Sequence, residues 1–264
     1  MVVSILGCGW YGKALALELI KKGVTVKGST TSAEKIEMLG EEGIIPYLID
    51  LSPNNKIFDD DFFICDILWI SVPPKARSGR GMEYIKQITE LVNIVNNHNI
   101  KQAVLISSTG VYGDYNTTVT EQNEPRPDSE VGKILLEAES MLKRETGFTT
   151  TVIRFGGLIG PRRDPGRFFA GKTGIPNGDA PVNLIHLTDC LGLSCALIEK
   201  QAFGNIYNAV APQHPSRAEF YTRAAKHSGL ETPQFIAEKK SWKVIESVNV
   251  PTLLQYVYQV DLNE

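Results

Sequence analysis

The sequence predicts an α/β fold, a doubly wound parallel sheet with a small C-terminal substrate lobe. Through the first 160 residues, short apolar runs rich in β-branched residues alternate with longer amphipathic segments. Continuous apolar runs of this kind are expected for parallel strands that helices cover on both faces. A glycine-rich turn also stands between the first apolar run and the first amphipathic segment, which is the arrangement of a Rossmann-type strand–helix junction.

The predicted elements of the core alternate regularly along the chain. The strands are Val2–Leu6, Val24–Lys27, Ile44–Ile49, Ile67–Val72, Val104–Ser107 and Thr150–Arg154. The helices between them are Gly12–Lys22, Ala33–Gly40, Met82–His98 and Ser129–Glu145. Because strand, crossover helix and strand repeat in this way, the segments are expected to form one parallel sheet.

The composition changes after the sixth predicted strand. Gly156–Gly178 is rich in Gly, Pro and Arg, so we expect a long loop there. Two helices and one strand are predicted beyond it: Asp189–Lys200, Pro215–Gly229 and the strand Ile206–Ala209. We therefore divide the chain into a dinucleotide-binding core, residues 1–155, and a smaller substrate lobe, residues 156–264, intertwined with the core as a single structural unit.

Composition excludes several classes of function. The chain of 264 residues has a formal net charge of -3, so its surface offers no general attraction to nucleic acid or to anionic lipid. No apolar run approaches the roughly 20 residues that span a bilayer. The chain starts directly in a predicted strand, which is not typical of a signal peptide. We expect a cytoplasmic protein without nucleic-acid or membrane partners, and leave a homodimer open.

The four cysteines show no metal-binding pattern. Cys8, Cys65, Cys190 and Cys195 form no C-x-x-C pair, and their spacing relative to the histidines suggests no metal site. All four lie in apolar stretches, so we expect buried free thiols and no metal.

The first strand is followed by Gly7-Cys8-Gly9-Trp10-Tyr11-Gly12, which fits G-x-G-x-x-G. In this context the glycines allow a tight turn and a close approach of the backbone to a pyrophosphate, which then meets the amino terminus of a helix. The alternative is a glycine-rich turn that serves only helix–sheet packing. We predict a nicotinamide dinucleotide as cofactor.

The end of the second strand selects between NAD and NADP. NAD binding favours an Asp or Glu there, which accepts from the ribose 2′-hydroxyl. The segment Lys27–Lys35 instead offers Thr30, Thr31 and Lys35, which could hold a 2′-phosphate. This favours NADP over NAD, although no arginine is present. Ser32 has the alternative role of helix N-cap.

Several segments together carry a family resemblance: Gly7–Gly12, Ile49–Leu51, Ser71–Pro74, Ser107–Gly113, Arg154–Arg162 and Asn183–Asp189. They resemble the extended and atypical short-chain dehydrogenases/reductases, most closely the compact bacterial branch called NAD-dependent epimerase/dehydratase-like proteins or nucleoside-diphosphate-sugar epimerases. The resemblance implies that Asp50 and Leu51 contact adenine and that Val72 and Pro73 line the dinucleotide cleft. The predicted cofactor-binding residues are therefore Gly7, Gly9, Trp10, Tyr11, Gly12, Thr30, Thr31, Lys35, Asp50, Leu51, Val72, Pro73 and Ser107.

The family's chemistry uses a Ser or Thr together with a Tyr and a Lys spaced as Y-x-x-x-K. One helical turn brings the lysine beside the phenol and lowers its pKa. The resemblance places Ser108 at the Ser position and Lys133 at the Lys position, but Ser129 stands where the Tyr belongs. We therefore predict an altered catalytic centre in which Ser108 orients the substrate, Lys133 holds the ribose, and Tyr112 or a water relays the proton.

Each of these residues has a structural alternative. Tyr112 could pack at the strand end, and Tyr11 could cover the sheet. Ser107 and Ser108 could cap the loop after their strand. Lys133 could hold the ribose without any catalytic role.

A cluster of arginines predicts the substrate side. Guanidinium groups suit a phosphate or a carboxylate, and Arg162, Arg163 and Arg167 lie together in a loop rich in Gly and Pro. We predict that Arg162 and Arg163 contact the substrate. The alternative is a solvated loop in which an arginine pairs with Asp164.

The segment Asn183–Asp189 completes the predicted substrate pocket. The resemblance implies that His186 shapes the pocket wall, with a structural histidine as the alternative, and Asp189 is expected to cap the next helix. Sugar-nucleotide enzymes often carry an arginine just upstream, where this chain has Pro181-Val182, which weakens a sugar-nucleotide substrate. Arg217 could serve in its place.

Two functions of different classes remain open from the sequence. The first is an NAD(P)-dependent reductase or epimerase that acts on a small polar substrate, with phosphorylated and sugar-type compounds as candidates. The second is a non-catalytic NADP(H) sensor or scaffold. Ser129 at the Tyr position favours the second, while Ser108 and Lys133 favour the first.

Overall fold

A seven-stranded parallel sheet forms the centre of the molecule, in a computed structural model that describes residues 1–52, 56–74, 79 and 81–264. The strand order is β10-β7-β5-β4-β1-β2-β3, and every pairing is parallel. The strands are β1 (Val2–Leu6), β2 (Thr25–Thr30), β3 (Ile45–Leu48), β4 (Ile67–Ile70), β5 (Gln102–Ser108), β7 (Thr149–Phe155) and β10 (Ile206–Ala209). The predicted Rossmann-type fold class is confirmed.

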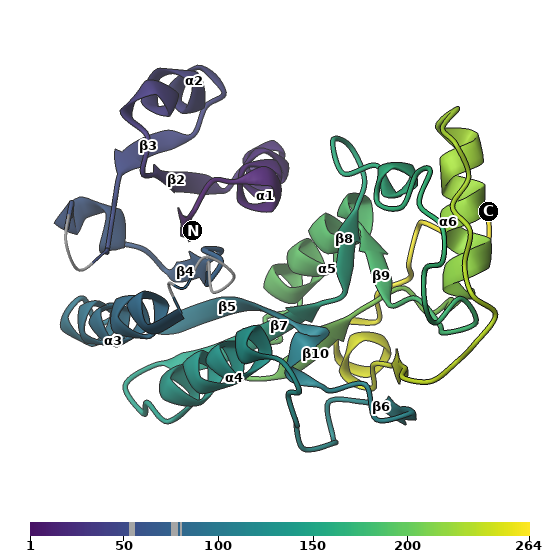
Figure 1. Cartoon of the computed structure of the whole chain (residues 1–264). Helices are drawn as coiled ribbons and strands as arrows, with labels where there is room; N and C mark the ends of the chain where they lie inside the picture. Colours follow the sequence, from purple (N-terminus) through teal and green to yellow (C-terminus); the bar gives the residue numbers. More distant parts are fainter. Residues whose placement is uncertain (53–55, 75–78, 80) are drawn as a thin grey trace.

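Helices cover both faces of this sheet (Figure 1). On one face lie α1 (Trp10–Lys21), α2 (Ile36–Glu41) and α5 (Leu187–Glu199). On the other lie α3 (Gly81–Asn97) and α4 (Glu130–Lys143). Since all seven strands are parallel, their carboxyl ends share one edge of the sheet, which is where doubly wound folds bind ligands.

A hydrophobic core lies on each face of the sheet, and alternate residues of the central strand β4 contribute to one core or the other. Ile67 and Trp69 of β4 pack with α1 and α5, whereas Leu68 and Ile70 pack with α3 and α4. All four are buried. A strand covered on both faces has no polar side, so the continuous apolar run in the sequence follows directly from its place in the sheet.

The predicted element boundaries differ from the observed ones by a few residues. The helix predicted from Gly12 begins at Trp10, because Gly9 already takes the extended N-cap conformation. The helix predicted from Ala33 begins as a 3₁₀ turn, Ala33–Lys35, before α2. Ser32 is the N-cap residue of that turn, as suggested, although its side chain makes no capping hydrogen bond.

Between β7 and α5 the chain contains two short strands that the sequence did not predict. The predicted loop Gly156–Gly178 contains β8 (Gly157–Ile159), which pairs with β9 (Leu184–His186). The glycine and the length of only three residues leave such a strand without a recognisable apolar pattern. It also contains a 3₁₀ turn, Pro165–Arg167.

The remaining elements gather beyond the sheet. Figure 1 shows α6 (Arg217–His227) near β8 and β9, on the side of the molecule away from α2 and β3. A second small sheet pairs β6 (Thr117–Val119) with β11 (Lys243–Ile245), and so crosses the predicted division at residue 155. A π-helical turn, Val250–Leu254, and a short 3₁₀ turn, Asp60–Phe63, complete the elements outside the site. The division into core and lobe stays a prediction.

Two further properties follow from the described part of the chain. None of its helices is both long enough and apolar enough to cross a membrane. The four cysteines are free; Cys190 and Cys195 are buried, whereas Cys8 and Cys65 are half-buried.

Candidate functional site

A cavity of about 320 Å³ opens at the carboxyl ends of β1 to β4. It brings together most of the residues that the sequence predicts to bind the cofactor: Gly7, Gly9, Thr30, Thr31, Lys35, Asp50, Leu51, Val72 and Pro73. These residues come from four separate loops, so their convergence on one cavity is a property of the fold rather than of any single motif.

The three glycines of the turn have different physical roles. Gly7 has φ +100°, which favours glycine, and its backbone N–H donates to the Ser29 hydroxyl at 2.9 Å. A Cβ on Gly12 would lie 2.2 Å from the Gly7 carbonyl oxygen, so Gly12 permits the close contact of α1 with the turn. A Cβ on Gly9 would meet no described atom within 4 Å. Gly9 is thus the glycine that leaves room for a ligand.

Trp10, Tyr11 and Gly12, also predicted to bind the cofactor, lie outside the residues that line this cavity. The Tyr11 ring is buried against Phe155, and its hydroxyl lies 2.6 Å from that of Ser194 on α5. Burial raises the pKa of Tyr11 well above its ordinary value. Its side chain therefore joins α1 to α5 and covers the sheet, the alternative that the sequence left open.

The part of the cavity beyond β2 and β3 is lined by polar groups that the sequence predicts to bind the cofactor. Thr30 ends β2 and Thr31 follows it; no carboxylate is present at this point, and Lys35 is exposed nearby. Asp50 lies at the end of β3, and its carboxylate accepts from the Ser52 N–H at 2.9 Å. The Asp50 carboxylate and the Lys35 ammonium thus lie on different segments that line the cavity, Asp50 after β3 and Lys35 after β2.

One wall of the cavity was missed from the sequence. It is the face of α3 formed by Glu83, Tyr84, Gln87, Ile88 and Leu91. Their spacing of three and four residues marks one face of a helix and could have identified that face. It could not have shown that the face reaches the cavity, because the packing of α3 beside β4 decides this.

Ser108, predicted to be catalytic, ends β5. Its hydroxyl accepts from the Gly110 N–H at 3.1 Å, and so it caps the short 3₁₀ turn Thr109–Val111. A Cβ on Gly132 of α4 would lie 2.2 Å from the Gly110 carbonyl oxygen, so the first turn of α4 rests on this loop. Ser108 is half-buried and lies near the start of α4.

Ser129 and Lys133, at the Y-x-x-x-K positions, do not converge on one point. Ser129 is the N-cap of α4, and its hydroxyl accepts from the Gly132 N–H at 3.1 Å. Lys133 is 62% exposed, and its ammonium lies 3.9 Å from Glu130 one turn earlier. The lysine therefore faces solvent, and its role at the ribose stays a prediction.

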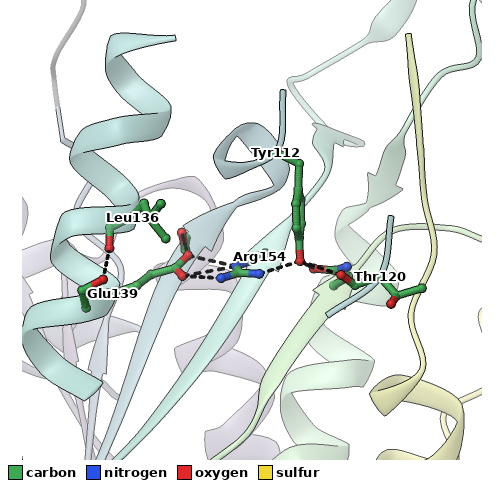
Figure 2. A network of polar contacts seen from close by, with 8 residues as sticks. Tyr112, Thr120, Leu136, Glu139 and Arg154 are labelled. Carbon is green, nitrogen blue, oxygen red and sulfur yellow. Dashed lines mark hydrogen bonds and ion pairs between the residues drawn. The ribbon is translucent and has the colours of Figure 1, made fainter. Parts of the chain in front are cut away.

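Tyr112, the predicted proton relay, lies within a buried polar network (Figure 2). Its hydroxyl accepts from an Arg154 N–H at 2.5 Å and lies 3.2 Å from the Asn208 side-chain oxygen and 3.1 Å from the Thr120 carbonyl. Burial raises the pKa of Tyr112, although the Arg154 charge opposes this. The phenol is thus committed to the protein interior and is a poorer acid than a free tyrosine.

An ion pair forms the centre of that network. Arg154 on β7 and Glu139 on α4 are each 2% exposed, and the guanidinium donates to the carboxylate at 2.6 Å. Burial opposes the charged guanidinium, but the hydrogen bond and the charge of Glu139 outweigh it and raise the pKa of Arg154. Ser107, predicted to bind the cofactor, donates to Glu139 at 2.6 Å and faces this pair.

The network continues from the sheet to the C-terminal region. Asn208 on β10 donates through its side chain to the Glu246 carbonyl at 3.0 Å. Its backbone N–H donates to Glu121 at 2.8 Å, and Glu121 also accepts from the Val248 N–H at 2.8 Å. Charged residues within apolar runs, such as Arg154 and Glu139, are the signal by which the sequence could have shown this network.

The arginine loop lies against the glycine turn. Gly160 and Arg163 close it with two backbone hydrogen bonds, and the Arg163 guanidinium lies 4.4 Å from the centre of the Trp10 ring. The Trp10 indole N–H donates to the Pro161 carbonyl at 2.6 Å. Arg162 has a positive φ of 64°, and its side chain is exposed. Arg167 pairs with Asp164 at 3.7 Å, the alternative considered for a loop arginine.

The other predicted substrate residues have structural partners. His186 is the N-cap of α5, and its ring nitrogen accepts from the Thr188 N–H at 3.2 Å. Asp189 is fully buried and binds the C-terminal segment through the Tyr256 hydroxyl and the Gln259 N–H, at 2.9 and 2.7 Å. Its predicted capping role is wrong, because His186 takes the cap position. Arg217 lies over the Phe169 ring and donates to a backbone carbonyl.

Comparison with known proteins adds a relative and a set of shared folds. The chain is similar to protein YeeZ of Escherichia coli (strain K12), with 39% identity over 263 residues that cover 97% of this chain and 95% of YeeZ. It also matches a UDP-glucuronic acid 4-epimerase from Bacillus cereus in complex with NAD, with a TM-score of 0.80, 21% identity, and coverage of 100% of this chain and 95% of that chain.

A UDP-glucose 4-epimerase from Thermotoga maritima, solved with UDP-glucose, matches with a TM-score of 0.80, 16% identity, and the same coverage of 100% and 95%. At these identities the two solved structures show a shared fold. No family model matches the chain.

Proposed function

The chain belongs to the atypical, epimerase/dehydratase-like short-chain dehydrogenases/reductases together with YeeZ, and from this premise we propose that it binds a nicotinamide dinucleotide. The observation that carries the proposal is the single cavity on which the predicted cofactor residues converge. Its glycine turn opens α1, so a pyrophosphate would meet backbone N–H groups at a helix amino terminus. The structurally similar epimerase from Bacillus cereus is described in complex with NAD.

We further propose that NADP is preferred over NAD. The tip of β2 offers Thr30 and Thr31 instead of a carboxylate, and Lys35 lies on the same cavity wall. Lys35→Ala should weaken NADPH about fivefold, the upper end for an exposed charge pair of ~1 kcal/mol, and leave NADH unchanged. Titration calorimetry with both cofactors measures this, and a native preference for NADH would contradict it.

Gly9→Val is the direct test of the cofactor site. The added side chain would enter the open space above Gly9 and should abolish NADPH binding while the protein stays folded. Gly40→Ala is the matched control, because a Cβ there meets only Pro46, at 3.8 Å, on a helix outside the cavity. NADPH affinity that survives Gly9→Val unchanged would sink the assignment.

As an enzyme, the protein would act on a small polar substrate, phosphorylated or of the sugar type, with an altered catalytic centre. Ser108 stands at the end of β5 where a carbonyl or hydroxyl could be oriented, and the exposed Arg162 offers a guanidinium to an anionic group. A cytoplasmic location and a homodimer belong to the same proposal.

A non-catalytic NADP(H) sensor or scaffold is the second candidate. It is favoured by the positions of the three groups expected to move protons: Ser129 caps a helix, Lys133 faces solvent, and the Tyr112 hydroxyl is held in the interior. Stopped-flow absorbance of NADPH mixed with a panel of aldehydes, ketones and nucleotide sugars separates the two. Substrate-dependent oxidation of bound NADPH supports the enzyme, and its absence across the panel supports the sensor.

A further inference from the structure

The cavity follows only one half of the path that a dinucleotide would take across the sheet edge. Its described lining residues come from the β1–α1 turn, from the segments after β2, β3 and β4, and from α3. None of them comes from β5, from α4 or from residues 156–190. At about 320 Å³, the cavity is near the lower end of the roughly 300–1,000 Å³ that ligand pockets occupy.

On the other side of the glycine turn, the protein makes contacts with itself. Trp10 follows Gly9 directly and is bound to the Pro161 carbonyl, while Arg163 stacks over its ring. Gly160 and Arg163 hold this short loop closed through hydrogen bonds of 3.2 and 2.8 Å. The backbone of the glycine turn is therefore open toward the cavity beyond β1 to β4. On the opposite side, toward β5 and β7, where the nicotinamide ring would lie, the turn is covered by the loop of residues 160–163.

The face of α4 that carries Glu139 is aliphatic at the positions before it. Glu139 contacts both Ser107 and Arg154 at the carboxyl ends of β5 and β7, which identifies the face of α4 that looks toward them. With 3.6 residues per turn, Leu135 and Val131 lie one and two turns earlier on that face. Lys133 lies off this face and is exposed. The Lys133 ammonium thus lies away from the face of α4 that carries Glu139, Leu135 and Val131.

From these three observations we propose that the site recognises the ADP-ribose half of the cofactor and takes no appreciable affinity from the nicotinamide riboside. The inference rests on the proposed function, because it concerns the same cavity. Pyrophosphate, ribose and adenine find formed partners at the glycine turn, the tip of β2 and the wall made by Asp50 and α3. Among the described residues, none from β5, β7 or β10 lines this cavity, so the nicotinamide ring lacks a comparable set of partners there. The ligand class is therefore an ADP-ribose nucleotide, with or without a 2′-phosphate.

Titration calorimetry of the full chain with separate halves of the cofactor tests this proposal. The probes are ADP-ribose against NADH, 2′-phospho-ADP-ribose against NADPH, and nicotinamide mononucleotide alone, all at one salt concentration. We expect each half-cofactor to bind within less than tenfold of its dinucleotide, a difference below about 1.4 kcal/mol, and nicotinamide mononucleotide not to bind. Gly9→Val should remove the binding of ADP-ribose and NADH together, and Gly40→Ala should retain both.

The outcomes separate this inference from the proposed function. Dinucleotides that bind tenfold or more tightly than their halves would overturn the inference and leave cofactor binding intact. ADP-ribose binding that survives Gly9→Val would place the nucleotide elsewhere and would also overturn it. If none of the probes binds, the proposed function falls and the inference with it.

Discussion

Along the carboxyl edge of the sheet, the polar groups at one end border a cavity, whereas those at the other end are buried in a hydrogen-bonded network. At the adenosine end, beyond β1 to β4, the backbone of Gly9 and the side chains of Thr31 and Lys35 border open space. At the reacting end, beyond β5, β7 and β10, Arg154 and Tyr112 are buried and fully engaged with other side chains. The same edge of one sheet thus carries a ligand cavity and a closed polar network.

The difference shows which end the protein keeps available for a ligand. A buried polar network stabilises and orders its surroundings only when its members satisfy one another, so its groups are not free for chemistry. Groups that border a cavity retain their hydrogen-bonding capacity for a bound molecule. The loops after β1 to β4 therefore offer polar groups to a ligand, whereas Arg154, Glu139 and Tyr112 beyond β5 and β7 are held by one another.

The largest expected effect on stability comes from breaking the buried ion pair between Arg154 and Glu139. Arg154→Met would leave the Glu139 carboxylate buried without its partner, so the free energy of unfolding should fall by about 3–5 kcal/mol. Urea denaturation measures this loss. The double variant Arg154→Met, Glu139→Leu should recover most of it, because no unpaired charge remains. A single variant that loses less than about 1 kcal/mol would show that the network is not the core of this end.

A comparison within the glycine turn separates packing from binding. A Cβ on Gly12 would clash with the Gly7 carbonyl, so Gly12→Ala should lose about 1–3 kcal/mol of stability. Gly9→Ala should keep its stability within about 0.5 kcal/mol, since its Cβ meets open space, and should weaken NADPH instead. Thermal unfolding with and without NADPH distinguishes them. Equal melting temperatures for the two variants would contradict this division of roles.

The contact between the turn and the arginine loop should give a smaller effect. Trp10→Phe keeps an aromatic ring under Arg163 but removes the indole N–H that donates to Pro161, at a cost of about 0.5–1.5 kcal/mol. Trypsin should then cleave after Arg162 or Arg163 faster than in the native protein. NADPH should slow this cleavage in the native protein if the loop responds to the cofactor. Unchanged cleavage in the variant would mean that Trp10 does not hold the loop.

The smallest effect concerns His186 and pH. Burial lowers its pKa below the ordinary value of 6.5, with Asp189 opposing this in part. Because the folded pKa is the lower one, the contribution of the neutral ring is present above pH 6.5 and is lost as pH falls through the folded pKa. His186→Asn, which keeps an N-cap acceptor, should flatten the pH dependence of unfolding between pH 7 and 5. A steeper loss in the variant would contradict the assignment.

The sequence by itself predicted the fold and most of the residues that line the cavity beyond β1 to β4. The alternation of apolar runs and amphipathic segments depends on local periodicity, and it predicted the parallel sheet that the structure has. The glycine turn at Gly7–Gly12 and the residues after the next strands are local signals too, and most of them line the cavity. Trp10, Tyr11 and Gly12 share that motif but lie outside the residues that line the cavity, which their spacing could not show.

Only the tertiary structure showed that the polar residues beyond β5 and β7 are bound to one another. The spacing of Ser129 and Lys133 matched Y-x-x-x-K, but a helix presents such residues to a site only if they lie on the face that meets it. α4 is oriented so that Glu139 binds Arg154, which lies on β7, 15 residues away in sequence. The Tyr112 hydroxyl likewise depends on Asn208, 96 residues away. Contacts between such distant residues form only on folding. The charges within these apolar runs could indicate a buried network, but they could not show which residues it joins.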